Sequence, residues 1–110
     1  MDCLFCKFAN KEIPMDFVYE NEHFFAIKDI APKAPIHILI ITKNHFRDIS
    51  QVEGEVLSSL ANFIKELSEK LGIDESGYRI ITNKNSDGGQ EIFHLHFHLL
   101  GGKKLGGLVC

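Results

Sequence analysis

The sequence predicts an α+β fold: a five-stranded, mostly antiparallel sheet with one long helix and a short N-terminal helix. Short apolar-rich stretches separated by polar turns indicate the strands, and one segment with apolar residues at three- and four-residue steps indicates the helix. The chain has 110 residues, of which 45% are hydrophobic, which is enough for one core. Because no internal repeat, low-complexity run or long linker is present, we expect a single domain over residues 1–110.

The first half of the chain predicts a short helical turn, a hairpin and a buried strand. The helical turn is expected near Cys6–Lys11. Phe17–Glu20 and His23–Asp29 are apolar-rich stretches joined through a polar link, which is typical of a hairpin. Ile36–Thr42 is rich in β-branched residues and predicts a buried strand, with His37 as its only ionisable side chain.

The long helix is predicted by an apolar stripe after residue 53. Ser50–Glu53 matches a capping box, in which the serine hydroxyl and the glutamate carboxylate satisfy backbone N–H groups of the first turn. Gly72 is suited to end the helix in a left-handed conformation. The stripe consists of Val56, Leu57, Leu60, Phe63, Ile64, Leu67 and Leu71.

The last third of the chain predicts two strands separated by a turn. The strands are expected over Tyr78–Asn83 and Glu91–Leu100, and the composition of Ser86–Gly89 indicates the turn. On the second strand His94, His96 and His98 would share one face, because successive side chains of a strand point to opposite faces. Leu95, Phe97 and Leu99 would then point into the core.

Three titratable groups on one face indicate a functional site, because such groups are costly to bury and add little to a core. In one interpretation the histidines bind a metal, although a straight strand cannot bring positions i and i+4 to one ion. In the other, one imidazole is a nucleophile that attacks phosphorus while its neighbours contact phosphate oxygens and carry protons. The pair Gly88-Gly89 would let backbone N–H groups approach a phosphate, although this signal alone is weak.

Composition argues against several classes of partner. The formal net charge is −3 and no cluster of basic residues extends beyond Lys103-Lys104, so nucleic-acid binding is not favoured. No apolar run approaches the ~20 residues of a membrane span, and no secretory signal is visible. The three cysteines are an odd count, which argues against a secreted disulfide framework, and we expect a cytoplasmic protein.

Two of the cysteines form the motif Cys3-x-x-Cys6, and the third, Cys110, has no assigned role. The pair could be two buried thiols, or a redox pair, although no thioredoxin-like βαβ pattern surrounds it. Two thiolates together with two imidazoles would instead make a closed tetrahedral zinc site.

The stretch from Asn83 to Gly102, NKNSDGGQEIFHLHFHLLGG, resembles the signature of the histidine triad superfamily. Lys11–Pro14, Asp29–His37 and Ile41–His45 match further motifs in the expected order. The chain is most similar to the HINT branch, the purine nucleoside phosphoramidases, and to bacterial members with a Cys-x-x-Cys pair. The resemblance covers nearly the whole chain and implies the fold of that superfamily.

The resemblance also implies roles for individual residues. His96 matches the nucleophile that forms a nucleotidyl-histidine intermediate. His98 and His37 match groups that contact the α-phosphate and the leaving-group side, and the backbone around His94 helps to orient the ring of His96. Positions that match the substrate pocket are Asp29 and Ile30 at the nucleoside and Asn83, Gly89, Gln90 and Glu91 at the phosphate and ribose.

A structural zinc ion is implied by the same resemblance, with Cys3, Cys6, His45 and His94 as its ligands. In that case the ring of His94 cannot also move a proton. No catalytic metal is required. The resemblance further implies a homodimer that binds purine nucleotides.

The implied activity is hydrolysis of the P–N bond of purine nucleoside 5′-phosphoramidates, such as adenosine 5′-monophosphoramidate. One alternative is a dinucleoside polyphosphate hydrolase of the same superfamily, and another is a non-enzymatic adaptor that binds nucleotide or is stabilised by zinc. The chain departs from the animal proteins at Glu91, where they carry serine, and in the tail Lys103–Cys110, which lacks their tryptophan. By the resemblance, both positions influence which leaving group the enzyme accepts.

Overall fold

The computed structural model describes residues 3–107 and confirms the α+β fold. A single sheet has the strand order β1-β2-β3-β5-β4, and every neighbouring pair is antiparallel. In residues 3–107 no helix is both long and apolar enough to cross a bilayer. The elements are α1 Leu4–Ala9, β1 Tyr19–Glu20, β2 Phe24–Lys28, β3 Ile36–Thr42, α2 Gly54–Ser58, α3 Leu60–Leu71, β4 Tyr78–Ile81 and β5 His96–Gly101.

Strand β3 lies at the centre of the sheet and has the bounds that its composition predicts. Its register places Leu39 opposite His98 and Ile41 opposite His96. Because paired residues of antiparallel strands point to the same face, the histidines of β5 share a face with His37. The sheet therefore gathers three imidazoles from two neighbouring strands.

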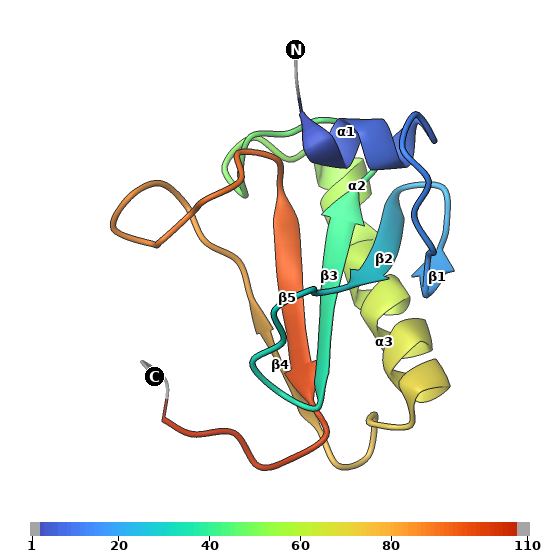
Figure 1. The fold of residues 1–110 in the computed structure, drawn as a ribbon, viewed down its shortest axis with the longest axis vertical. Helices are drawn as coiled ribbons and strands as arrows, with labels where there is room; N and C mark the ends of the chain where they lie inside the picture. Colours follow the sequence, from blue (N-terminus) through green and yellow to red (C-terminus); the bar gives the residue numbers. More distant parts are fainter. Residues whose placement is uncertain (1–2, 108–110) are drawn as a thin grey trace.

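The two faces of the sheet carry different cores. Alternate residues of β2 and β3, such as Phe24 and Ile40, pack with Phe63 and Leu67 of α3, and Leu95, Phe97 and Leu99 join this core as predicted. The opposite residues, Phe25, Ile27, Leu39 and Ile41, pack with Phe5 and Phe8 of α1. Figure 1 shows α1 beside the end of β3 and the start of β5, at the N-terminal end of the chain. The remainder of that face carries the side chains of His37, His96 and His98.

The helical region differs from the prediction at its start. The hydroxyl of Ser50 donates to Asp48 rather than capping a helix. The helix that follows, α2, begins only at Gly54, and its N-cap Glu53 makes no side-chain hydrogen bond. The expected single helix is divided at Ser59 into α2 and α3. Its end is as predicted, because Gly72 has a left-handed φ of 74°.

Helix α1 begins at Leu4, two residues before the expected Cys6. Its N-cap is Cys3, whose sulfur accepts the backbone N–H of Cys6 at 3.4 Å. Sulfur is a weak acceptor and cysteine is not among the preferred N-cap residues, so the start of this helix could not be predicted from a capping residue. The cysteine pair therefore lies at the start of this helix.

The histidine strand is shorter than predicted, because β5 begins at His96 and not at Glu91. The N–H of Leu95 donates to the carbonyl of Phe46 at 2.6 Å, whereas the residues before His94 form an irregular loop. His94 therefore precedes the strand. The rings of His94 and His96 nevertheless both contact the ring of Phe5, at 5.8 Å and 5.3 Å between ring centroids. Strand β4 also ends early, at Ile81 instead of Asn83.

Candidate active site and metal centre

A pocket of about 860 Å³ opens on the histidine face of the sheet. Its wall includes most of the residues that the sequence singles out for substrate: Asp29, Ile30, His37, Asn83, Gly89, Glu91, His96 and His98. His94 and Gln90 are not part of this wall. The wall also includes Phe8, Ile27 and Leu39, which the sequence analysis did not assign to a site. The strand alternation could have revealed Leu39, since it shares a face with His37.

His96 is half-buried at the start of β5, and its ring is fixed by the main chain. Nδ1 lies 2.8 Å from the carbonyl oxygen of His94. A carbonyl can only accept, so Nδ1 carries the proton and a neutral ring keeps its lone pair on Nε2. The edge contact with Phe5 restrains the ring further. This arrangement leaves one imidazole nitrogen ready to act as a nucleophile.

His37 and His98 form a chain of hydrogen bonds beside His96. The backbone N–H of Lys33 donates to Nδ1 of His37 at 3.0 Å, so the proton of a neutral His37 is on Nε2. That Nε2–H lies 2.9 Å from Nδ1 of His98 and donates to it. A neutral His98 therefore carries its own proton on Nε2. The ring of His98 lies 5.2 Å from that of His96, centroid to centroid.

Burial favours the neutral form of both rings, His37 and His98. It lowers the pKa of His98 to about 4, with smaller contributions from His96 and His37. Burial also lowers the pKa of His37, although the nearby carboxylate of Asp29 opposes this shift. Oδ2 of Asp29 lies 3.3 Å from Nε2 of His37, so the carboxylate can stabilise a proton that reaches that ring.

The depressed pKa of His98 predicts a loss of stability in acid. The unfolded chain binds a proton at its usual pKa of 6.5, whereas the folded chain binds it only near 4. The unfolded state therefore holds more protons in this range, so this contribution is complete above about pH 6.5 and declines as pH falls toward 4. We expect the free energy of unfolding in denaturant titrations to fall less steeply over this range in His98→Asn, whose side-chain oxygen can still accept from His37. Equal slopes in the variant and the wild type would contradict this assignment.

Asp29 and Ile30 lie together at the turn after β2. Oδ1 of Asp29 accepts the backbone N–H of Ala31 at 2.8 Å, which fixes the carboxylate at the pocket wall. The side chain of Ile30 is 98% exposed although it is apolar. A carboxylate beside an uncovered apolar side chain suits a ligand with both hydroxyls and a flat apolar ring.

The loop between β4 and β5 brings Asn83, Gly89 and Glu91 to the same pocket. Gly88 is needed because a Cβ there would lie 2.7 Å from the carbonyl oxygen of Lys84, and Gly89 has a φ of 77°. Gly88 thus permits a tight approach within the loop itself, in the turn that the composition of Ser86–Gly89 predicts. Glu91 is exposed.

Gln90, whose position matches the phosphate and ribose lining by resemblance, does not belong to the pocket wall. Gln90 is 8% exposed, and its amide is used within the protein. Oε1 accepts the N–H of Asn85, and Nε2 donates to the carbonyl oxygens of Arg47 and Ile92. An amide with both ends occupied away from the pocket holds the loop rather than a ligand.

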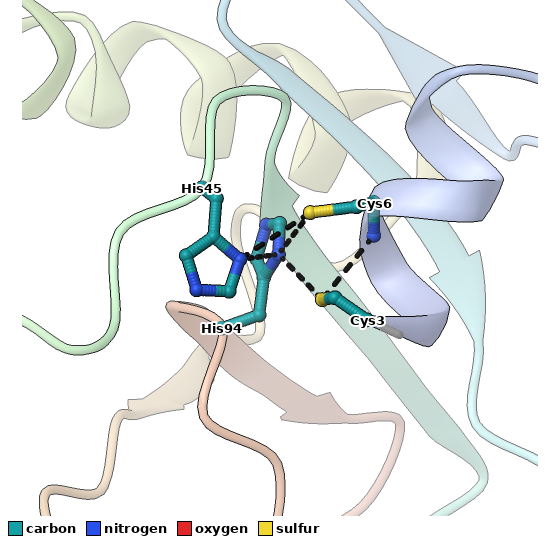
Figure 2. Close-up of side chains that lie close together, drawn as sticks. All are labelled: Cys3, Cys6, His45 and His94. Carbon is teal, nitrogen blue, oxygen red and sulfur yellow. Dashed lines mark hydrogen bonds between the residues drawn. The ribbon is translucent and has the colours of Figure 1, made fainter. Parts of the chain in front are cut away.

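A second cluster lies at the end of the sheet next to α1, where Cys3, Cys6, His45 and His94 point toward one another (Figure 2). Nδ1 of His94 lies 3.2 Å from Sγ of Cys3 and 3.5 Å from Sγ of Cys6. Nδ1 of His45 lies 3.3 Å from Sγ of Cys6 and 3.1 Å from Nδ1 of His94. The structure therefore brings together the four residues that the resemblance implies as ligands.

The spacing and chemistry of this cluster fit a tetrahedral metal ion. An ion bonded to sulfur at about 2.3 Å and to nitrogen at about 2.0–2.1 Å would separate its ligand atoms by about 3.3–3.8 Å. Nε2 of His94 donates to the carbonyl oxygen of Thr42 at 2.7 Å, which leaves Nδ1 unprotonated toward the cluster. The donor set is thus compatible with structural zinc.

The protonation states of Cys6 and His94 depend on whether the cluster binds a metal ion. Burial, followed by the hydrogen bond and the charge of Cys3, raises the pKa of Cys6 to about 11. Burial is also the main cause that lowers the pKa of His94 to about 4. A bound divalent cation would replace the thiol protons, so metal binding here is expected to release protons. The third cysteine, Cys110, lies outside the described residues.

The fold and the pocket are those of a small α+β enzyme with imidazole groups in its site. The family model described as the HIT domain matches residues 10–105, and the chain belongs to this family. It is 41% identical to a purine nucleoside phosphoramidase of Escherichia coli over 112 aligned residues, which cover 99% of this chain and 94% of that protein.

Solved structures agree with this family assignment. A HIT family hydrolase from Clostridium thermocellum superposes with a TM-score of 0.90 at 42% identity, covering 99% of this chain and 97% of that one. A HIT family hydrolase from Legionella pneumophila superposes with a TM-score of 0.85 at 45% identity, covering 96% of each chain. These relatives support the assignment of this chain as a hydrolase.

Proposed function

We propose that the chain hydrolyses the P–N bond of purine nucleoside 5′-phosphoramidates through a nucleotidyl intermediate on His96. The observation that carries the proposal is the hydrogen bond from Nδ1 of His96 to the carbonyl of His94, which reserves Nε2 for attack at the pocket wall. The name of the Escherichia coli relative, purine nucleoside phosphoramidase, supports the substrate class.

In the first step Nε2 of His96 forms a bond to the α-phosphorus, and the P–N bond to the leaving amine breaks. The departing nitrogen needs a proton, and Nε2–H of His98 can donate it, because the hydrogen bond from His37 to Nδ1 of His98 keeps the proton of His98 on Nε2. His96 keeps its own proton on Nδ1, so the positive charge that forms on its ring is stabilised by the carbonyl oxygen of His94. Splitting the displacement into two steps lowers the barrier of each.

In the second step water attacks phosphorus, the bond to Nε2 of His96 breaks, and the nucleoside monophosphate is released. The proton of the water returns to Nε2 of His98, which restores the starting state. No metal ion takes part in either step. Asp29 and Ile30 would bind the ribose hydroxyls and the base, and Asn83, Gly89 and Glu91 would line the phosphate and the leaving-group side.

The Cys3, Cys6, His45 and His94 cluster would hold a structural zinc ion in this proposal. We also propose, from the family resemblance, a cytoplasmic homodimer formed by one domain over residues 1–110. Light scattering on the purified protein would test the oligomeric state, and metal analysis would test for one zinc per chain.

The activity test uses adenosine 5′-monophosphoramidate and guanosine 5′-monophosphoramidate. We expect release of ammonia and of the monophosphate in equal amounts, and a sample quenched in alkaline denaturant should contain a nucleotidyl group on a peptide that includes His96. Cleavage of dinucleoside polyphosphates but not of phosphoramidates would instead favour the polyphosphate hydrolase. Nucleotide binding without turnover of either class would favour the adaptor.

A further inference from the structure

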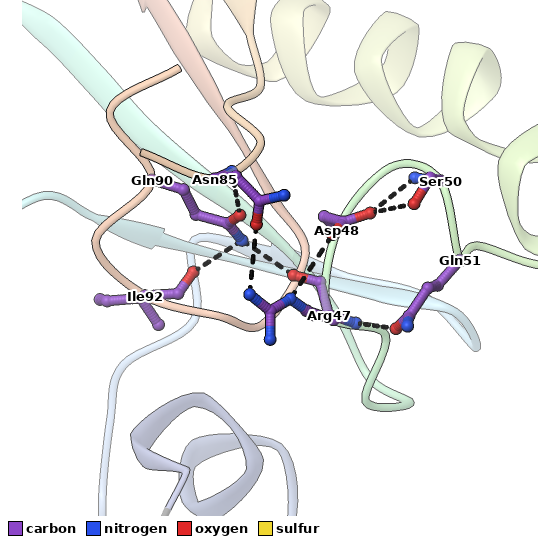
Figure 3. A network of polar contacts seen from close by, with 7 residues as sticks. All are labelled: Arg47, Asp48, Ser50, Gln51, Asn85, Gln90 and Ile92. Carbon is purple, nitrogen blue, oxygen red and sulfur yellow. Dashed lines mark hydrogen bonds and ion pairs between the residues drawn. The ribbon is translucent and has the colours of Figure 1, made fainter. Parts of the chain in front are cut away.

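The loop between β4 and β5 contains no helix or strand between residues 82 and 95, yet it is attached firmly to the loop over residues 43–48 (Figure 3). We name the first the glycine loop, residues 84–93, and the second the metal loop, residues 43–48. The glycine loop supplies Gly89 and Glu91 to the pocket, and the metal loop supplies His45 to the metal cluster. Contacts between the two loops therefore join the two sites.

Gln90 makes the first set of contacts. Its Oε1 accepts the N–H of Asn85 at 2.8 Å, and its own N–H donates to the carbonyl of Asn85 at 3.0 Å, so the glycine loop is closed on itself. Its Nε2 donates to the carbonyl of Arg47 in the metal loop at 2.8 Å and to that of Ile92 at 3.2 Å. One buried side chain thus holds three main-chain groups in two loops.

Arg47 makes the second set of contacts. Its Nη2 donates to Oδ1 of Asn85 at 3.2 Å, and its guanidinium carbon lies 4.5 Å from the centre of the Phe93 ring. Asn85 has a φ of 57°, a backbone conformation that its side chain tolerates better than most. Both ends of the glycine loop are therefore held by one residue of the metal loop.

We propose that Gln90 and Arg47 are positioning residues that together form a brace, which sets the place of Gly89 and Glu91 in the pocket relative to His96. The proposal rests on the proposed function for its catalytic consequence. Gln90 lies between the two pocket residues in sequence, so movement of its side chain shifts both of them. A misplacement of about 1 Å at a reacting group can lower the rate by about 10²-fold.

The test replaces Gln90 with glutamate, which has nearly the same shape. Gln90→Glu retains an acceptor for Asn85 but removes both N–H donors and places a carboxylate against the carbonyls of Arg47 and Ile92. We expect kcat for adenosine 5′-monophosphoramidate to fall by about 10- to 100-fold, KM to change by less than about threefold, and zinc content to stay that of the wild type. Hydrogen–deuterium exchange should accelerate over residues 84–93.

Gln51→Ala is the matched control. Oε1 of Gln51 accepts the N–H of Arg47 at 2.8 Å, so this substitution also removes a side-chain hydrogen bond to Arg47 but none to the glycine loop. Its kcat and its exchange over residues 84–93 should remain within about twofold of the wild type. If Gln90→Glu does not fold, Arg47→Lys replaces it, because lysine cannot reproduce the planar guanidinium between Asn85 and Phe93.

Wild-type exchange and wild-type kcat in the Gln90 and Arg47 variants would overturn the brace. Equal losses of kcat in the Gln51 control would overturn it as well, since the effect would then be general loosening of the metal loop. If the wild-type protein does not cleave phosphoramidates, the proposed function fails, and the exchange measurement alone still decides whether the brace holds the glycine loop.

Discussion

Replacement of His96 with alanine is expected to lower turnover of adenosine 5′-monophosphoramidate by about 10⁴-fold or more, the scale seen when an enzyme loses its nucleophile. The nitrogen lost is the one that the carbonyl of His94 reserves for attack through its hydrogen bond to Nδ1. The fold should survive, because His96 is only half-buried and belongs to neither hydrophobic cluster. Steady-state assays of ammonia release, with thermal melts of the same samples, measure both effects.

His23→Ala provides the control for the loss of an imidazole elsewhere. His23 lies outside the pocket wall and interacts with Glu22, so turnover should remain that of the wild type. Mass spectrometry after quenching in alkaline denaturant should find the nucleotidyl group in wild-type protein and in His23→Ala but not in His96→Ala. A His96→Ala variant that keeps wild-type turnover would exclude the nucleophilic mechanism.

Loss of the zinc ion proposed for the Cys3, Cys6, His45 and His94 cluster is expected to have the second large effect, on stability. Removal of zinc with a chelator, or the substitution Cys6→Ser, should lower the melting temperature by more than about 10 °C, which corresponds to a loss of about 2–3 kcal/mol in a domain of this size. The cluster ties α1 to the metal loop and to His94. Differential scanning calorimetry with parallel metal analysis measures the effect.

Turnover should fall together with the zinc content, although no step of the proposed hydrolysis uses the metal ion. Phe5 of α1 packs edge-on against the rings of both His94 and His96, so release of the helix removes a contact that restrains the nucleophile. Return of zinc to the chelated protein should restore both melting temperature and turnover, whereas Cys6→Ser should recover neither in full. A melting temperature that does not respond to chelation would mean that the cluster holds no stabilising ion.

Local patterns predicted the central part of the fold well. The β-branched run of β3 has the predicted bounds, and the alternation of Leu95, Phe97 and Leu99 with the histidines correctly identified the core face. Gly72 ends α3 as expected, because its requirement for a left-handed φ is a property of one residue. Such features depend on neighbouring residues, which the sequence shows directly.

Two kinds of contact account for the failures: a competing local contact at Ser50, and contacts between distant residues around Gln90 and the start of β5. Ser50 matches a capping box, but its hydroxyl and its N–H both donate to the carboxylate of Asp48 two residues earlier, a local turn that Asp favours. Strand β5 starts late, and Gln90 is withdrawn from the pocket, because Arg47 and Phe46 of the metal loop supply hydrogen-bond partners. Nothing in the local pattern around Gln90 shows that a carbonyl 43 positions earlier accepts its amide.

His94 makes three separate contacts, and this determines which effects a substitution at this position would have. One ring nitrogen points to the cysteines, the other holds Thr42, and the main-chain oxygen holds His96. The first two tasks belong to the side chain, whereas the third belongs to the backbone and survives any substitution that keeps the main chain in place. A lineage could therefore abandon the ion while retaining catalysis, provided that other packing came to support the N-terminal helix.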